Sequence, residues 1–200
     1  MMLTETGVVT AGALPVEAFK DHLRLGTGFA DDGFQDALVE TYLRASIAAI
    51  EGRIGKALLT RQFKMVRQDW RRADDQPFPL APVATIVSVT VFDGLGGSVL
   101  IAADRYRLVS DMHRPRLVAA GTALPVVPTG GRVEVIFEAG FGAAWAQVPR
   151  DLAQAVMLLA AEYHERRHDV GTGGTAGLPF GVVSLIDRWR TVRVLGGGAA

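Results

Sequence analysis

The sequence predicts an α+β fold: a helical bundle with an inserted small antiparallel β unit and an extended C-terminal segment. Three observations lead to this expectation. Apolar residues recur with helical spacing in residues 14–58 and again in residues 149–168. Between them, residues 62–138 contain short runs rich in β-branched residues, separated by glycine and proline turns. A chain of 200 residues suits one domain of this kind, so we expect a single domain over residues 1–200.

The first helical region is expected to contain two helices. Pro15 suits the first turn of a short helix, which ends at the glycines of residues 26–28. Asp31 or Asp32 is a candidate N-cap for a longer helix. The apolar positions of that longer helix are Phe34, Leu38, Val39, Tyr42, Leu43, Ala45, Ile47, Ala49, Ile50 and Ile54. They form a face wider than one stripe, so we expect two sides of the helix to be covered, by its own bundle or by a neighbouring subunit.

The central region is expected to form short strands. They cover residues 63–67, 83–92, 99–102, 105–109, 116–118 and 133–137. The sequence DGLGG at residues 93–97 predicts a tight reversal between two of them. Residues 77–82 include three prolines, which lack the backbone N–H of a central strand. That segment should therefore run as an extended lead into the strand that begins at residue 83.

Helical spacing returns at Pro149 and continues to residue 168, with Asp151 in the first turn, where a negative charge suits the helix dipole. A glycine-rich loop at residues 171–181 follows this helix. The chain then closes with a C-terminal segment, residues 178–200, in which residues 182–189 have the spacing of a short helix.

Composition excludes several classes of function. Lys plus Arg (21) equals Asp plus Glu (21), so the chain as a whole is not attracted to nucleic acid or to an anionic membrane. Cysteine is absent, which excludes disulfides, thiolate metal sites and a cysteine nucleophile. The first residues do not resemble a signal peptide, and no run of about eighteen apolar residues predicts a membrane span. We therefore expect a soluble chain that is made in the cytoplasm.

One motif has the form of a metal site. His164-Glu165-Arg166-Arg167-His168 matches the H-E-x-x-H pattern, in which two histidines bind zinc and the glutamate acts as a base. The extended metzincin pattern fails, because Gly174 stands at the third ligand position and no methionine follows Met157. The competing interpretation is the charged last turn of a helix.

The remaining candidates have simpler interpretations. Neither glycine cluster, residues 94–97 or residues 171–177, lies between a strand and a helix in the order that a phosphate-binding loop requires, so both predict turns. The charged run of residues 69–75 predicts a solvated strand end, in which Trp70 is a candidate interface anchor.

The order of several segments resembles that of the head-to-tail connector (adaptor) proteins of long-tailed phages and phage-derived gene transfer agents. The matching residues are Ala45, Ser46, Ile47, Ile50 and Ile54, residues 78–83 and 86–89, Tyr106-Arg107-Leu108, residues 137–142, Val148-Pro149, residues 152–163, Glu165, Arg166, residues 179–183, Leu185 and Trp189-Arg190. None of these residues is a catalytic signature. One departure is Phe137-Glu138, where the family often has Tyr-Arg, and it changes surface charge more than fold.

The resemblance implies a structural virion protein, not an enzyme, that uses no cofactor or metal and contacts no membrane. Its copies would form a dodecameric ring in the neck between the capsid and the tail. That ring would join the portal protein to a stopper or tail-terminator protein. During ejection DNA would pass through its channel without sequence-specific contact, which fits the balanced charge of the chain.

The C-terminal segment is the predicted docking element for the portal, since apolar and aromatic residues flanked by arginine are typical of interface hot spots. The residues predicted to bind the partner are Leu185, Ile186, Arg188, Trp189, Arg190 and Arg193. An alternative is that this segment packs on its own bundle. Two other functional classes stay open from the residues alone: a zinc-dependent hydrolase that uses His164, Glu165 and His168, and a small-molecule-binding or regulatory module.

Overall fold

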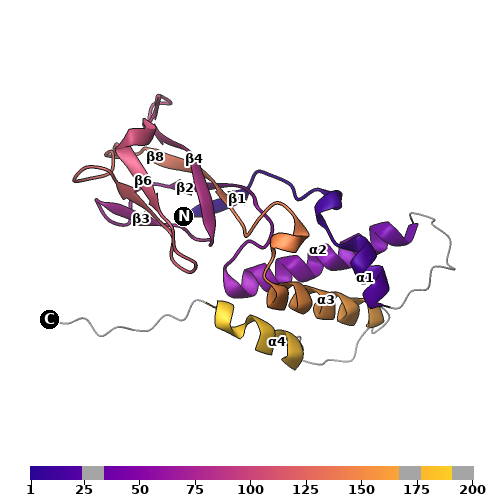
Figure 1. The fold of residues 1–200 in the computed structure, drawn as a ribbon. Helices are drawn as coiled ribbons and strands as arrows, with labels where there is room; N and C mark the ends of the chain where they lie inside the picture. Colours follow the sequence, from indigo (N-terminus) through magenta and orange to yellow (C-terminus); the bar gives the residue numbers. More distant parts are fainter. Residues whose placement is uncertain (24–33, 167–176, 191–200) are drawn as a thin grey trace.

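The computed structural model describes residues 1–23, 34–166 and 177–190. Over these residues the chain forms four α-helices and two antiparallel sheets. The helices are α1 (Val16–His22), α2 (Phe34–Ile54), α3 (Arg150–Glu165) and α4 (Phe180–Ile186). In Figure 1 the sheets lie at one end of the molecule and the helices at the other. The expected α+β class is confirmed.

The larger sheet has five strands in the order β1-β2-β8-β4-β5. The strands are β1 (Met2–Glu5), β2 (Arg61–Arg67), β4 (Val83–Phe92), β5 (Ser98–Leu100) and β8 (Arg132–Ala139). Strand β1 precedes the helices and was not predicted, because four residues are too few to show a period. The β part is therefore more than an insertion between helices, since it includes the N-terminus of the chain.

The smaller sheet has three strands in the order β3-β7-β6. They are β3 (Asp75–Pro77), β6 (Tyr106–Val109) and β7 (Arg116–Ala119). As the prolines predicted, residues 77–82 contribute no central strand: Pro77 ends the edge strand β3. The two sheets share a hydrophobic core that includes Phe63, Met65, Trp70, Phe78, Leu117, Val133, Val135 and Phe137. The predicted small β unit is thus a two-sheet body with a core of its own.

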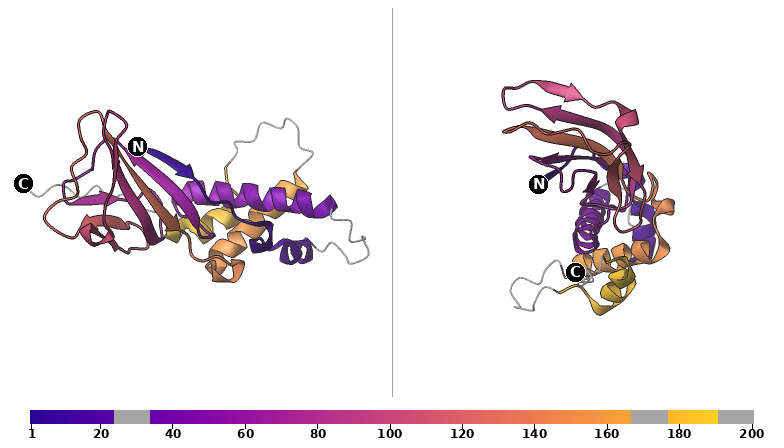
Figure 2. Two further views of the ribbon diagram at one scale, coloured as in Figure 1. Left: turned by 90° about the horizontal axis from the view of Figure 1, so that it is seen from above. Right: turned by 90° about the vertical axis from the view of Figure 1, so that its left-hand side faces the viewer.

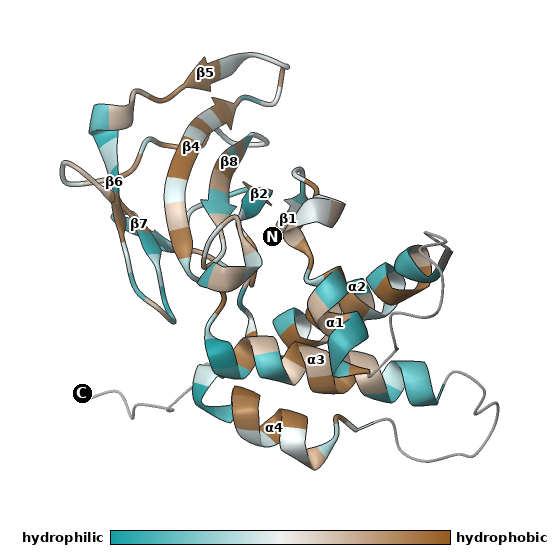
Figure 3. Ribbon diagram, turned by 45° about the vertical axis from the view of Figure 1, so that its right-hand side comes forward, coloured by the Kyte–Doolittle hydropathy of each residue, from teal (hydrophilic) through white to brown (hydrophobic). Residues whose placement is uncertain are grey.

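The helices enclose a second hydrophobic core. Helix α2 contacts α1 and α3, and α4 packs on α3. Figure 3, which is coloured by hydropathy, shows apolar residues recurring along these helices. Val39, Leu43 and Ile50 of α2 are buried there, whereas Leu38 is exposed. Helix α2 therefore has one buried face in the single chain, and part of its wide apolar surface stays uncovered. Asp31 and Asp32, the candidate N-caps, and the glycines at 26–28 lie outside the described residues.

A short junction after α2 connects the two cores. Helix α2 ends at Ile54, earlier than the predicted helical region, because Gly55 adopts a positive φ of 67°. At the end of β8, Gly140 has a φ of 141°, and a Cβ on it would lie 2.4 Å from the Thr60 backbone nitrogen. Only glycine permits this close approach of β8 to the junction.

The bounds of the last two elements differ from those that the sequence indicated. Helix α3 ends at Glu165, and residues 167 and 168 lie outside the described part. The expected extended C-terminal segment is helical where it is described, because α4 is followed by a 3₁₀ turn at Asp187–Trp189. No helix among the described residues is long and apolar enough to cross a membrane.

Candidate docking surface

The described part of the C-terminal segment is anchored on the helical core. Val182 and Ile186 of α4 are fully buried, and Leu185 packs against the same core. The one-turn spacing of Val182 and Ile186 places both side chains on the face that contacts α3. Of the predicted docking residues, Leu185 and Ile186 thus contact their own chain in this conformation.

Asp151 holds the end of the segment against the first turn of α3. Its Oδ2 accepts a hydrogen bond from Trp189 Nε1 at 2.6 Å and lies 2.7 Å from Arg188 Nε. The Trp189 ring meets Phe141 edge to face, with centroids 5.4 Å apart. A carboxylate in the first turn of α3 also suits the helix dipole. Trp189 is therefore fixed on both its polar and its apolar side.

Three side chains of the segment face outward. Arg188 and Arg190 are exposed, the latter paired with Asp187 at 3.0 Å. Phe180 is 86% exposed and was not among the predicted site residues. Phe180 lies two positions before the buried Val182, which is about 200° of helical rotation. A helical wheel of the sequence would therefore have placed Phe180 on the exposed face. Arg193 lies outside the described residues. The exposed part of the segment is thus a large aromatic ring with two arginines.

The zinc motif is only partly described. His164 is half-buried and meets the Tyr42 ring edge to face at 5.9 Å, whereas Glu165 is exposed. His168 lies outside the described residues. Within the described ranges no three His, Asp or Glu side chains cluster as a metal site would require.

Trp70 is a core residue and not the exposed interface anchor that the sequence suggested. It is buried between the sheets, and its Nε1 donates to the Pro125 carbonyl at 2.7 Å. Asp75, in the same charged run, is also buried and pairs with Arg116 at 3.1 Å. Asp69, Arg71, Arg72 and Asp74 are exposed as predicted, so the run departs from the expectation only at Trp70 and Asp75.

A buried lysine at the junction was missed by the sequence analysis. Lys56 is fully buried, and its ammonium group donates to the Met112 carbonyl and lies 3.3 Å from His113 Nδ1. Burial lowers the pKa of Lys56, and the negative charge of Asp111 partly offsets that effect. No motif marks such a residue. The contact ties the loop between β6 and β7 to the end of α2, which is a structural role.

Comparison with known proteins connects the whole chain to one kind of particle. A chain in the neck of an empty gene transfer agent (GTA) particle with C6 symmetry is 57% identical, with a TM-score of 0.88. A chain in the virion of a native GTA particle is 58% identical, with a TM-score of 0.85. A chain in the neck of a native GTA particle with C12 symmetry is 53% identical, with a TM-score of 0.84. Each similarity covers 98% of this chain and 99% of the other chain. No protein-family model and no curated protein matches.

Identity above one half over nearly the full length implies shared ancestry as well as a shared fold. The matched proteins are structural components of the particle, in a non-enzymatic role. The comparisons give no support to the hydrolase alternative. The chain belongs to the head-to-tail connector family of long-tailed phages and phage-derived gene transfer agents.

Proposed function

We propose that this protein is a ring-forming structural component of the neck of a gene transfer agent particle, where it joins the capsid portal to the tail side. The observation that carries this proposal is the similarity along 98% of the chain to proteins in GTA necks. C6 and C12 symmetry of those necks are both compatible with a dodecamer. A stopper or tail-terminator protein is the proposed neighbour on the tail side.

The proposed portal contact is the C-terminal segment. Leu185 and Ile186 hold it on α3, so that Arg188, Trp189 and Arg190 are presented in a fixed arrangement. Phe180 adds an exposed aromatic surface, and Arg193 adds a further positive charge. An aromatic side chain flanked by arginine has the composition of a binding hot spot.

The proposed role in DNA passage rests on charge. A wall that neutralised many phosphates would bind DNA tightly through counterion release. Equal numbers of acidic and basic residues, 21 of each, avoid that attraction for the molecule as a whole. DNA would then pass the ring without sequence-specific contact.

Electron microscopy of the purified protein mixed with portal tests this proposal. We expect rings seated on one end of the portal. The double variant Arg188→Glu/Arg190→Glu should bind portal at least tenfold more weakly. The matched control is Arg71→Glu/Arg107→Glu, which makes the same change of charge at exposed positions of the β part. A chain that neither forms rings nor binds portal would overturn the proposed function. Equal loss in both double variants would show that the segment is not the contact.

A further inference from the structure

The two edges of the five-stranded sheet both expose apolar side chains. At one edge are β5 and the β4–β5 hairpin, where Leu95 is 98% exposed and Val99 and Leu100 are also exposed. At the other edge is β1, where Met2, its first residue, and the preceding Met1 are exposed. Natural proteins usually protect sheet edges with charge, proline or a covering segment. Apolar groups exposed at both edges indicate surfaces that a partner covers.

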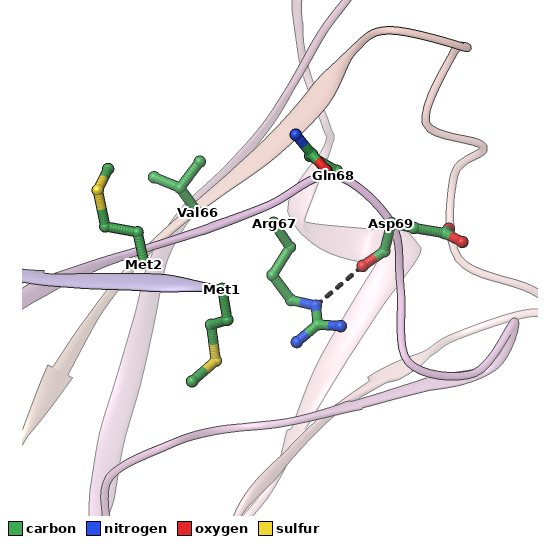
Figure 4. Close-up of a pocket in the computed structure, with 6 residues that line it drawn as sticks. All are labelled: Met1, Met2, Val66, Arg67, Gln68 and Asp69. Atoms are coloured by element: carbon green, nitrogen blue, oxygen red, sulfur yellow. Dashed lines mark hydrogen bonds between the residues drawn. The ribbon is translucent and has the colours of Figure 1, made fainter.

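The β1 edge also carries a hollow. A shallow pocket of about 500 Å³ is lined by Met1, Met2, Val66, Arg67, Gln68 and Asp69 (Figure 4). Arg67 Nε donates to the Asp69 carbonyl at 2.8 Å, and within the described residues the other guanidinium nitrogens have no partner. The hollow thus combines methionine side chains with an available positive charge.

Hairpin and hollow lie at the same level of the sheet. Met2 of β1 pairs with Val66 of β2. The same row of paired residues then crosses the sheet through Glu134 of β8 and Thr90 of β4 to Leu100 of β5. This row lies at the end of the strands away from the helices. The right-hand view of Figure 2 shows the N-terminus at one edge of the sheet and the strands of the opposite edge well separated from it. A rotation about an axis along the strands would therefore bring the hairpin of one copy to the hollow of the next.

A ring requires this kind of pairing. Copies related by rotation in a closed ring contact each other through two different surfaces, one on each side of the subunit. We propose that the β4–β5 hairpin of one copy, with Leu95 at its tip, occupies the Met1, Met2 and Arg67 hollow of the neighbouring copy. Asp93 at the base of the hairpin accepts the backbone N–H groups of Leu95 and Gly97 through its Oδ1, and in the proposed contact its Oδ2 pairs with Arg67. This inference rests on the ring of the proposed function and specifies which surfaces close it.

Cross-linking tests the contact directly, because the chain has no cysteine of its own. The double variant Leu95→Cys/Gln68→Cys places one thiol on each surface, both at exposed positions. A short bismaleimide should convert its rings into a ladder of covalent multimers on a denaturing gel. The matched control is Leu95→Cys/Gln154→Cys, since Gln154 is exposed on α3 in the helical part. It should give at least tenfold less of the higher multimers, and each single variant should stop at dimers.

The outcomes separate this inference from the proposed function. A ladder specific to the Leu95→Cys/Gln68→Cys variant supports the contact. Rings seen by electron microscopy without that ladder would overturn the contact and leave the ring intact. If the native chain forms no rings, alone or with portal, the proposed function fails and the contact with it. As a second measurement, Leu95→Asp should leave the thermal unfolding midpoint unchanged and reduce the assembled fraction at least tenfold. An unchanged assembled fraction would count against the contact.

Discussion

Lys56 is fully buried, and its polar neighbours explain how the fold accommodates an amine there. Its hydrogen bond to the Met112 carbonyl and its proximity to His113 satisfy the amine. Burial still disfavours the charged form, so the pKa is lowered from 10.5. A lowered pKa means that the unfolded chain binds more protons than the folded chain in the interval between the two pKa values. Stability should therefore rise with pH across that interval.

Replacement of Lys56 by Met tests this pH dependence. The free energy of unfolding of the native protein should rise relative to that of Lys56→Met as the pH increases toward 10.5, and the difference should be constant near neutral pH. Titrating groups that do not interact with Lys56 cancel in the difference, and Asp111, whose pKa Lys56 helps to lower, titrates at acidic pH, outside this interval. Urea unfolding at a series of pH values measures it. A difference that does not change with pH would show that Lys56 has an ordinary pKa.

At the scale of elements, α4 is a packing helix with one exposed face. Its buried face is made of Val182 and Ile186, and Asp151 anchors the residues that follow. A helix of seven residues is too short to be stable alone, so its structure depends on α3. Arg188 and Arg190, which follow α4, can be presented to a partner only while that packing holds.

Substitutions on the two faces of α4 should differ sharply in stability. Ile186→Ala removes a fully buried side chain and should lower the free energy of unfolding by about 2–5 kcal/mol. Phe180→Ala, on the exposed face, should change it by less than about 0.5 kcal/mol. Urea unfolding followed by circular dichroism compares the two. Equal effects would mean that α4 does not pack on α3 as described.

At the scale of the whole molecule, two hydrophobic cores are joined by a buried ion pair. Glu51 at the end of α2 binds Arg61 at the start of β2 through contacts of 3.0 and 2.7 Å. Glu51 also accepts the Leu58 backbone N–H at 2.6 Å, and Glu5 of β1 lies 2.8 Å from Arg61. Burial alone would lower the pKa of Arg61, but the hydrogen bonds and charge of Glu51 raise it. The pair therefore links helix and sheet as charged groups.

This link predicts that the two cores unfold together. Trp70 reports on the core between the sheets, so a Trp145→Phe/Trp189→Phe background isolates its fluorescence, while circular dichroism follows the helices. The two transitions should coincide. Glu51→Ala leaves Arg61 with the Glu5 carboxylate but without its two hydrogen bonds to Glu51, removes the acceptor of the Leu58 N–H, and should cost about 1.5–3 kcal/mol. The surface pair of Glu40 and Arg44 provides the control, since Glu40→Ala should cost only about 0.3–0.5 kcal/mol. Separate transitions in the protein with native Glu51 would refute the coupling.

The local spacing of apolar residues in the sequence determined where most helices and strands lie. The strand at residues 83–92 has the predicted bounds, and the helices α2 and α3 lie within their predicted regions, because the period of apolar residues is a short-range property. The order of segments likewise predicted the connector family, which the comparisons confirmed. The residues predicted to bind the partner stay a prediction.

Tertiary structure decided what depends on pairing between distant segments. Strand β1 exists because β2 offers it an edge, and the division of the strands into two sheets follows from which edges pair. Trp70, Lys56 and Ile186 are each compatible with a surface or a buried position by local sequence. Their burial is set by segments far along the chain, such as the Pro125 and Met112 carbonyls. Sequence spacing determines which face of an element a residue occupies, but only the packing of elements decides whether that face meets water, the same chain or another copy.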